Sequence, residues 1–241
     1  MKKGSGFLTA LVIFLFSTAQ AQETKNKDME FIIQSLNLQE SKVDLENSIE
    51  KPLRYLPEIM GYAIMEKTSD EPGLRSYNCH VVLYNASNKE ITNKYSFPLS
   101  TDVMELTEVN FDFAPYTVKS ATRAFGLRFH LVGPSKPNPL TEEKFYLFVP
   151  EKTTLIPVLK DFTSYQYSGE WDMNCAGEFN ESNAYFVMQT TSTNGYNDIQ
   201  VNCKKINTIK KMVAGECEAK EIGSREMLTL IFQNGIYTVK K

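Results

Sequence analysis

Two arginines and an aspartate carry the clearest recognition chemistry in this 241-residue sequence. Arg128 lies in residues 125–132, which alternate apolar and polar side chains as a half-buried strand does, and Arg123 stands just before them. Asp112 occupies a polar position in the alternating residues 109–113. Because guanidinium groups bind carboxylate and phosphate bidentately, Asp112, Arg123 and Arg128 are candidate ligand-binding residues for an anionic ligand. The plainer interpretation is an Arg–Asp pair on a solvated sheet face.

A second candidate is a pair of carboxylates, Glu170 and Asp172, which flank the single tryptophan, Trp171. Paired carboxylates perform glycoside hydrolysis when the fold sets their separation correctly. The alternative is a polar strand end beside a half-buried tryptophan. His80 and His130 are the only histidines, and neither belongs to a recognisable nucleophile–base motif. We therefore predict no catalytic residues, no metal site and no cofactor.

Four cysteines follow the first 21 residues, and their even number predicts two disulfides in an exported protein. Cys203 and Cys217 are 14 residues apart in a region of consecutive predicted strands, which favours their pairing. Cys79 and Cys175 would then join the two halves of the chain. Three connectivities are possible for four cysteines, and buried free thiols are the remaining alternative.

From about residue 57 the sequence predicts strands separated by turn residues. Asn194-Gly195 and Asn234-Gly235 are dipeptides typical of tight hairpin turns. The predicted fold class is mostly β, either an antiparallel sandwich or two small β units, with a short helical N-terminal segment. We expect a β domain over residues 57–150 and a second β unit over residues 151–241, which could form one continuous domain.

The N-terminal residues predict export. A positive start, a short apolar run and Ala19-Gln20-Ala21 make residues 1–21 a predicted signal peptide. Residues 22–56 are expected to be helical or extended, with helical spacing of apolar residues in 29–36 and again in 45–53. The expected location is secreted or periplasmic, with no integral membrane span after cleavage.

The charge balance argues against nucleic acid as a partner. The formal charge is −3, and loss of Lys2 and Lys3 with the signal peptide lowers it to −5. Phosphate backbones require a basic surface, which an acidic chain of this composition does not predict. The expected partner is an envelope or extracellular protein, or a small ligand.

Part of the chain resembles exported bacterial proteins of unknown function. The resemblance covers about residues 100–149 and is carried by Ser100-Thr-Asp-Val-Met-Glu-Leu-Thr, Phe113-Ala-Pro-Tyr116, Thr122-Arg-Ala-Phe-Gly-Leu-Arg128 and Pro137-Asn-Pro139. It implies an exported β-rich domain and assigns no site residues.

Together these features predict an exported, non-enzymatic protein that binds a ligand or another protein through a sheet face or the loops at its end. Two other classes remain open. One is an exported hydrolase that acts on envelope or glycan material through carboxylates such as Glu170 and Asp172. The other is a structural component of the envelope.

Overall fold

The computed structural model describes residues 27–71 and 74–240. The predicted signal peptide, residues 1–21, lies outside the described residues. Strands make up 76% of the structure and helices 6%, which confirms the mostly β fold class. Residues 27–35 are helical, and a short 3-10 helix, η1 (Glu40–Lys42), precedes the first strand.

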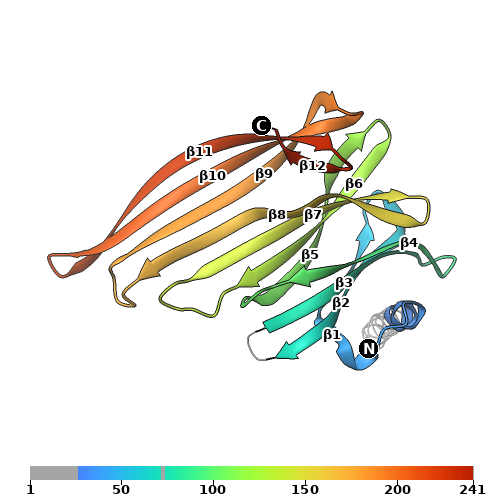
Figure 1. The fold of residues 1–241 in the computed structure, drawn as a ribbon, viewed down its shortest axis with the longest axis horizontal. Helices are drawn as coiled ribbons and strands as arrows, with labels where there is room; N and C mark the ends of the chain where they lie inside the picture. Colours follow the sequence, from blue (N-terminus) through green and yellow to red (C-terminus); the bar gives the residue numbers. More distant parts are fainter. Residues whose placement is uncertain (1–26, 72–73, 241) are drawn as a thin grey trace, which may run out of the picture.

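Twelve strands form one open, mostly antiparallel sheet (Figure 1). Their bounds are β1 (Val43–Leu53), β2 (Leu56–Glu71), β3 (Leu74–Asn85), β4 (Glu90–Ser100), β5 (Glu105–Lys119), β6 (Thr122–Val132), β7 (Leu140–Glu151), β8 (Thr154–Trp171), β9 (Gly177–Thr193), β10 (Tyr196–Val213), β11 (Glu216–Gln233) and β12 (Ile236–Val239).

Two runs of antiparallel neighbours meet within this sheet. Strands β1 to β4 pair in chain order, and strands β5 to β12 do the same. The runs join where Lys94 of β4 lies beside Thr154 of β8. There β4 and β8 run parallel, whereas the neighbours within each run are antiparallel. Both predicted β regions, 57–150 and 151–241, contribute to this one sheet, because β7 and β8 pair with each other on either side of residue 150.

The strands β6 and β7 lie in the middle of the molecule and are covered on both faces. On one face, Phe125, Phe129 and Phe148 pack against β1 to β4 in the largest apolar core. On the other face, Phe145 and Leu147 pack against β9 to β12 in a second core. Burial on both faces explains why residues 145–149 are a continuous apolar run instead of an alternating one.

The N-terminal helix covers the outer face of the first strands. Ile32 and Ile33 are buried against Tyr62 and Tyr84 of β2 and β3, so the helical spacing in residues 29–36 is confirmed. The second helical spacing belongs instead to strand β1. Pairing with β2 buries Leu53 completely, and Pro52 is compatible with an edge strand but not with the interior of a helix.

The far ends of three strands project from the packed part of the molecule (Figure 1). We call residues 177–183 of β9, 204–213 of β10 and 216–226 of β11 the arm, and the cores formed by β1 to β8 with the base of β9 to β12 the body. Residues 216–227 of β11 are all exposed. Among the residues of the arm, Phe179 of β9 alone is buried, where it packs against Tyr167 and Trp171 of β8. The β10–β11 part of the arm therefore buries little on either of its faces.

The disulfide joins Cys175, in the β8–β9 loop, to Cys217, at the start of β11, with 5.7 Å between their Cα atoms. The favoured pairing of Cys203 with Cys217 is therefore wrong, and so is that of Cys79 with Cys175. Cys203 faces Glu226 across the β10–β11 pair, whereas Cys217 faces Met212. Nine residues of extended strand, about 30 Å, separate those positions, so the two thiols cannot meet.

The two remaining cysteines are free and buried in different cores. Cys79 lies in the core between the two strand runs, and Cys203 lies in the core beneath β9 to β12. Burial raises the pKa of both thiols.

Candidate functional site

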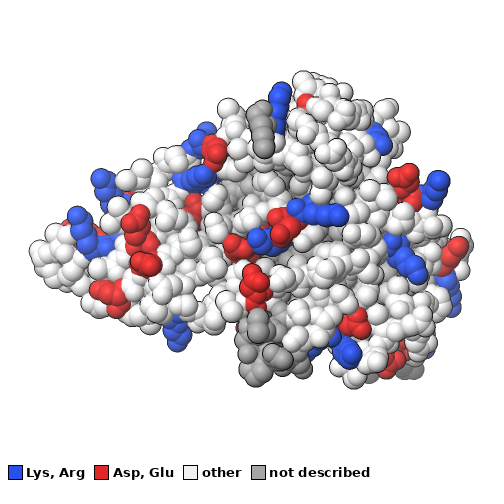
Figure 2. All heavy atoms as spheres, in the orientation of Figure 1, with Lys and Arg blue, Asp and Glu red and all other residues white. Residues whose placement is uncertain are grey.

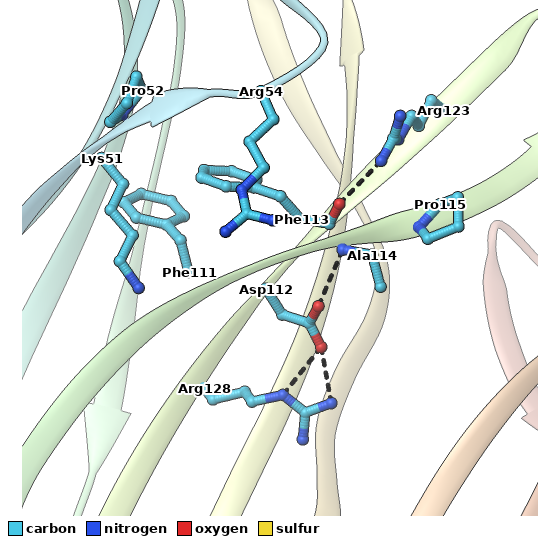
Figure 3. Close-up of a pocket in the computed structure, with 10 residues that line it drawn as sticks. All are labelled: Lys51, Pro52, Arg54, Phe111, Asp112, Phe113, Ala114, Pro115, Arg123 and Arg128. Atoms are coloured by element: carbon cyan, nitrogen blue, oxygen red, sulfur yellow. Dashed lines mark hydrogen bonds and ion pairs between the residues drawn. The ribbon is translucent and has the colours of Figure 1, made fainter.

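The three predicted ligand-binding residues line one cleft of about 760 Å³ (Figure 3). Asp112 belongs to β5, whereas Arg123 and Arg128 belong to β6. Other lining residues are Lys51 and Pro52 of β1, Arg54 of the turn that follows it, and the segment from Phe111 to Pro115 of β5. The cleft therefore lies where β1 crosses the edge of the central strands.

An irregularity in β5 shapes one wall of the cleft. Strand β5 advances four residues, from Asp112 to Tyr116, while its partner β6 advances only two, from Gly126 to Ala124. Pro115 lies in the extra stretch and has no N–H to pair. Two backbone groups within this bulge bind side chains of the site: the Phe113 carbonyl accepts from Arg123 Nη2, and the Ala114 N–H donates to Asp112 Oδ1.

All three guanidinium nitrogens of Arg128 donate hydrogen bonds within the protein. Its Nε and Nη2 donate to Asp112 Oδ2 at 3.0 and 2.8 Å, and its Nη1 donates to Glu143 Oε1 at 2.6 Å and to Ser164 Oγ at 3.2 Å. Its guanidinium carbon lies 4.2 Å from the centre of the Phe145 ring. Burial acts to lower the pKa of Arg128, but the hydrogen bond to Asp112 and the charge of Glu143 outweigh it and raise the pKa.

Both carboxylate oxygens of Asp112 also accept hydrogen bonds within the protein. Its carboxylate accepts from the Ala114 N–H at 3.0 Å and from the Tyr116 hydroxyl at 2.7 Å, besides Arg128. Burial acts to raise the pKa of Asp112, and these donors outweigh it, so the pKa lies below its ordinary value. A Cβ added to Gly126 would lie 2.4 Å from the Phe145 ring and 3.0 Å from Asp112 Cβ, so glycine allows this close packing.

Arg123 differs from Arg128 because no carboxylate of the described residues binds it. Its Nη2 donates to the Phe113 carbonyl at 2.8 Å, and its guanidinium carbon lies 4.2 Å from the centre of the Tyr55 ring. Its Nε is buried and has no hydrogen-bond partner in the structure. The cation is thus held in place by a carbonyl and an aromatic face, neither of which neutralises it.

Lys51 and Arg54 complete the cleft, and sequence reasoning missed both. Their side chains are exposed, and no ion pair or hydrogen bond joins either side chain to another described residue. The signal that could have drawn attention to them is the spacing of two cations around Pro52, in a segment that we expected to be partly helical. Because Arg128 neutralises Asp112, the cations Lys51, Arg54 and Arg123 give the cleft its excess positive charge.

The two carboxylates of the hydrolase hypothesis both lie at exposed positions. Glu170 lies exposed on β8 opposite Glu178, and Asp172 is exposed in the following turn. Asp172 Oδ1 accepts from the N–H groups of Asn174 and Cys175, and these bonds lower its pKa. The Trp171 indole donates to the Lys136 carbonyl at 2.7 Å. The three residues are accounted for by turn and strand geometry, so the hydrolase hypothesis loses its main support.

Residues 27–71 and 74–240 offer neither a metal-binding cluster nor a membrane-spanning helix. No group of three or more His, Cys, Asp or Glu side chains there is arranged to hold a metal ion. None of the helices in this part of the chain has the length and apolarity that a membrane crossing requires.

Comparison with known proteins adds no family to these observations. No protein-family model matches the chain, and no match was found among curated proteins or among solved structures. The resemblance of residues 100–149 to exported bacterial proteins therefore stays a prediction.

Proposed function

We propose that this chain is an exported, non-enzymatic protein that binds a small anionic ligand in the cleft formed by Lys51, Arg54 and Arg123. The observation that carries the proposal is the contrast within that cleft. Arg128 is neutralised by Asp112 and Glu143, whereas Arg123, Lys51 and Arg54 have no carboxylate partner among the described residues.

The chemistry of the cleft favours a carboxylate or a phosphate ester that carries an apolar group. Arginines bind these anions through paired N–H donors, and one such cation is pre-positioned here by the Phe113 carbonyl and the Tyr55 ring. Pro52, Pro115 and Phe113 supply rigid apolar walls. Ligand sites of this kind combine apolar walls with a few fixed polar groups.

The wider surface supports a local site instead of a general affinity for anions. Figure 2 shows acidic and basic side chains interspersed over the visible face of the molecule. The whole chain carries a formal charge of −3. Attraction of an anion therefore depends on the cluster of cations at the cleft and not on the net field of the protein.

Export is the second part of the proposal. The predicted signal peptide supports it, and the Cys175–Cys217 disulfide is compatible with an oxidising compartment. Cell fractionation together with the mass of the purified protein tests this part. We expect a chain that begins at Gln22 outside the cytoplasm. An uncleaved chain in the cytoplasm would contradict the prediction.

Calorimetric titration with a panel of small carboxylates and phosphate esters tests the cleft. We expect binding that weakens as salt is added, and a loss of about tenfold in affinity for each of the variants Arg54→Gln and Arg123→Gln. The matched control is Arg225→Gln, an arginine on the arm, which should leave the affinity unchanged. The proposal fails if no anion of the panel binds, or if the affinity is the same in all three variants.

A further inference from the structure

Strand β11 presents a long sheet edge that no other described residue covers. Strand β12 pairs only with its last four residues, Leu230–Gln233, and the Lys240 N–H donates to the Thr229 carbonyl at 2.8 Å. Upstream of that bond β11 pairs with β10 alone. All side chains of residues 216–227 are exposed.

The backbone groups along this edge point in a defined direction. The Thr229 carbonyl is bound on the side away from β10. Because backbone groups of consecutive residues point to opposite sides of a strand, every second residue before Thr229 directs its N–H and C=O to the same free side. These residues are Ala219, Glu221, Gly223, Arg225 and Met227. An unpaired row of this kind is a template for another strand.

We propose that this edge pairs with the same edge of a second copy of the chain, antiparallel and centred on Gly223. In such a symmetric pair each residue faces a residue on the same side of the sheet. With the axis at Gly223, Glu221 faces Arg225 of the second copy, and Lys220 faces Glu226 of the second copy. Symmetry repeats both contacts, so four opposite-charge pairs form across the interface.

Charge complementarity selects this register. An axis at Ile222 places Glu218 opposite Glu226 of the second copy, and an axis at Ser224 forms no ion pair. An axis at Ala219 pairs Glu218 with Lys220 but overlaps only residues 216–222. The axis at Gly223 overlaps residues 218–228, which is almost the whole free edge, and it alone joins two kinds of opposite charge. Opposite charges stabilise directly facing positions, and like charges destabilise them.

The charged side chains needed for this contact are available. No ion pair or hydrogen bond joins the side chains of Lys220, Glu221 or Arg225 to another described residue. Arg225 faces Lys204 on β10, a like-charged neighbour that a carboxylate of the second copy would offset. Glu226 is already bound to Lys205 at 2.5 Å, and both side chains stay about half exposed.

Gly223 itself fits a position at the axis. A Cβ added there would meet only the Lys205 carbonyl, at 4.0 Å, so the monomer leaves room for a side chain. Glycine in the interior of a strand often marks a place where another backbone approaches closely. At the axis, two glycines would face each other and allow the two strands to pair without a side-chain clash.

Sedimentation of the purified native protein over a range of concentrations tests the pairing. We expect a reversible dimer. Arg225→Glu places a carboxylate opposite Glu221 of the second copy at two symmetric contacts, which should weaken the dimer about 30-fold. The same change faces Lys204 within the monomer, so the fold should be retained. Adding Glu221→Arg restores the opposite charges and should restore the dimer. Glu216→Lys, outside the paired stretch, is the matched control.

Cysteine cross-linking tests the register. Facing residues in a hydrogen-bonded antiparallel pair have Cα atoms about 5.5 Å apart, which suits a disulfide. Gly223→Cys should therefore give a covalent dimer on mild oxidation, whereas Ile222→Cys, which faces Ser224 of the second copy, should not.

Three results would overturn the inference. The first is a protein that stays monomeric at every concentration, even if its free edge binds a different protein. The second is a dimer that Arg225→Glu does not weaken or Glu221→Arg does not rescue. The third is cross-linking that is equal at positions 222 and 223. None of these results depends on the anion site, which lies on the body.

Discussion

The body and the arm belong to the same sheet, yet they bury very different amounts of surface. In the body, Phe125, Phe129 and Phe145 are completely buried, because strands pack on both faces of β6 and β7. In the arm, residues 216–227 of β11 are exposed throughout. Apolar burial therefore stabilises the body, whereas the arm depends mainly on backbone pairing, the disulfide and the packing of Phe179 at its base.

The same contrast separates the two proposed interaction sites. The cleft lies on the body, where packed strands hold Arg123 and Arg128 at fixed positions. The free edge lies on the arm, where the recognition groups belong to the backbone and to exposed charged side chains. We expect substitutions in the body to change the free energy of unfolding and those in the arm to change association.

The largest expected effect follows from truncation of the body's core. Phe129 is fully buried and contacts Phe97 and Tyr146 edge to face. Phe129→Ala should lower the free energy of unfolding by about 4 kcal/mol, measured by urea denaturation. Ile222→Ala on the arm is the control and should change it by less than about 0.5 kcal/mol. Equal losses for the two variants would remove the distinction between body and arm.

Arg128→Met should have the next largest effect, about 3 kcal/mol, because it leaves Asp112 and Glu143 without their shared cation in a mostly buried place. Urea denaturation measures this loss. The control is Arg54→Met, which removes an exposed and unpaired cation and should leave the stability within about 0.5 kcal/mol. A loss as small as that of Arg54→Met would contradict the assignment of Arg128 as the cation that holds Asp112 and Glu143 together.

Removal of the disulfide should affect the arm more than the body. The bridge closes a loop with a sequence separation of 42, for which chain entropy predicts about 4 kcal/mol. We expect about 2 kcal/mol for Cys175→Ser with Cys217→Ser, because the arm can open while the body stays folded. Hydrogen exchange should show faster exchange in the arm and unchanged protection in β6 and β7. Faster exchange in both regions would contradict this division.

The smallest expected effect is a dependence on pH through Asp112. Its pKa in the folded protein is lowered, so its stabilising contribution is complete above the unfolded value of about 4 and is lost as the pH falls through the folded value. Asp112→Asn should therefore cost about 1.5 kcal/mol at pH 7, and this cost should shrink at pH 3. Asp172→Asn, in the exposed turn, should show a smaller difference. A cost for Asp112→Asn that is the same at both pH values would contradict the assignment.

Much of the fold could be predicted from local patterns. Alternation in residues 125–132 and the turn dipeptides Asn194-Gly195 and Asn234-Gly235 reflect strand geometry, which neighbouring residues determine. The apolar spacing of residues 45–53 fits a helix, but these residues form strand β1 because they pair with β2. The disulfide pairing could not be predicted from the sequence either, because Cys175 and Cys217 come together only when the β8–β9 loop lies against β11.

The sequence by itself therefore determined the mostly β fold class, the helix in residues 29–36 and the candidate status of Asp112, Arg123 and Arg128. Only the tertiary structure decided how these three residues differ. Packing against Glu143, Ser164 and Phe145 neutralised and buried Arg128, whereas the bulge of β5 and the approach of β1 left Arg123 beside two free cations. The spacing of residues along β6 cannot encode this difference, because the neutralising carboxylates come from the paired strands β5 and β7, and the free cations come from β1 and the turn that follows it.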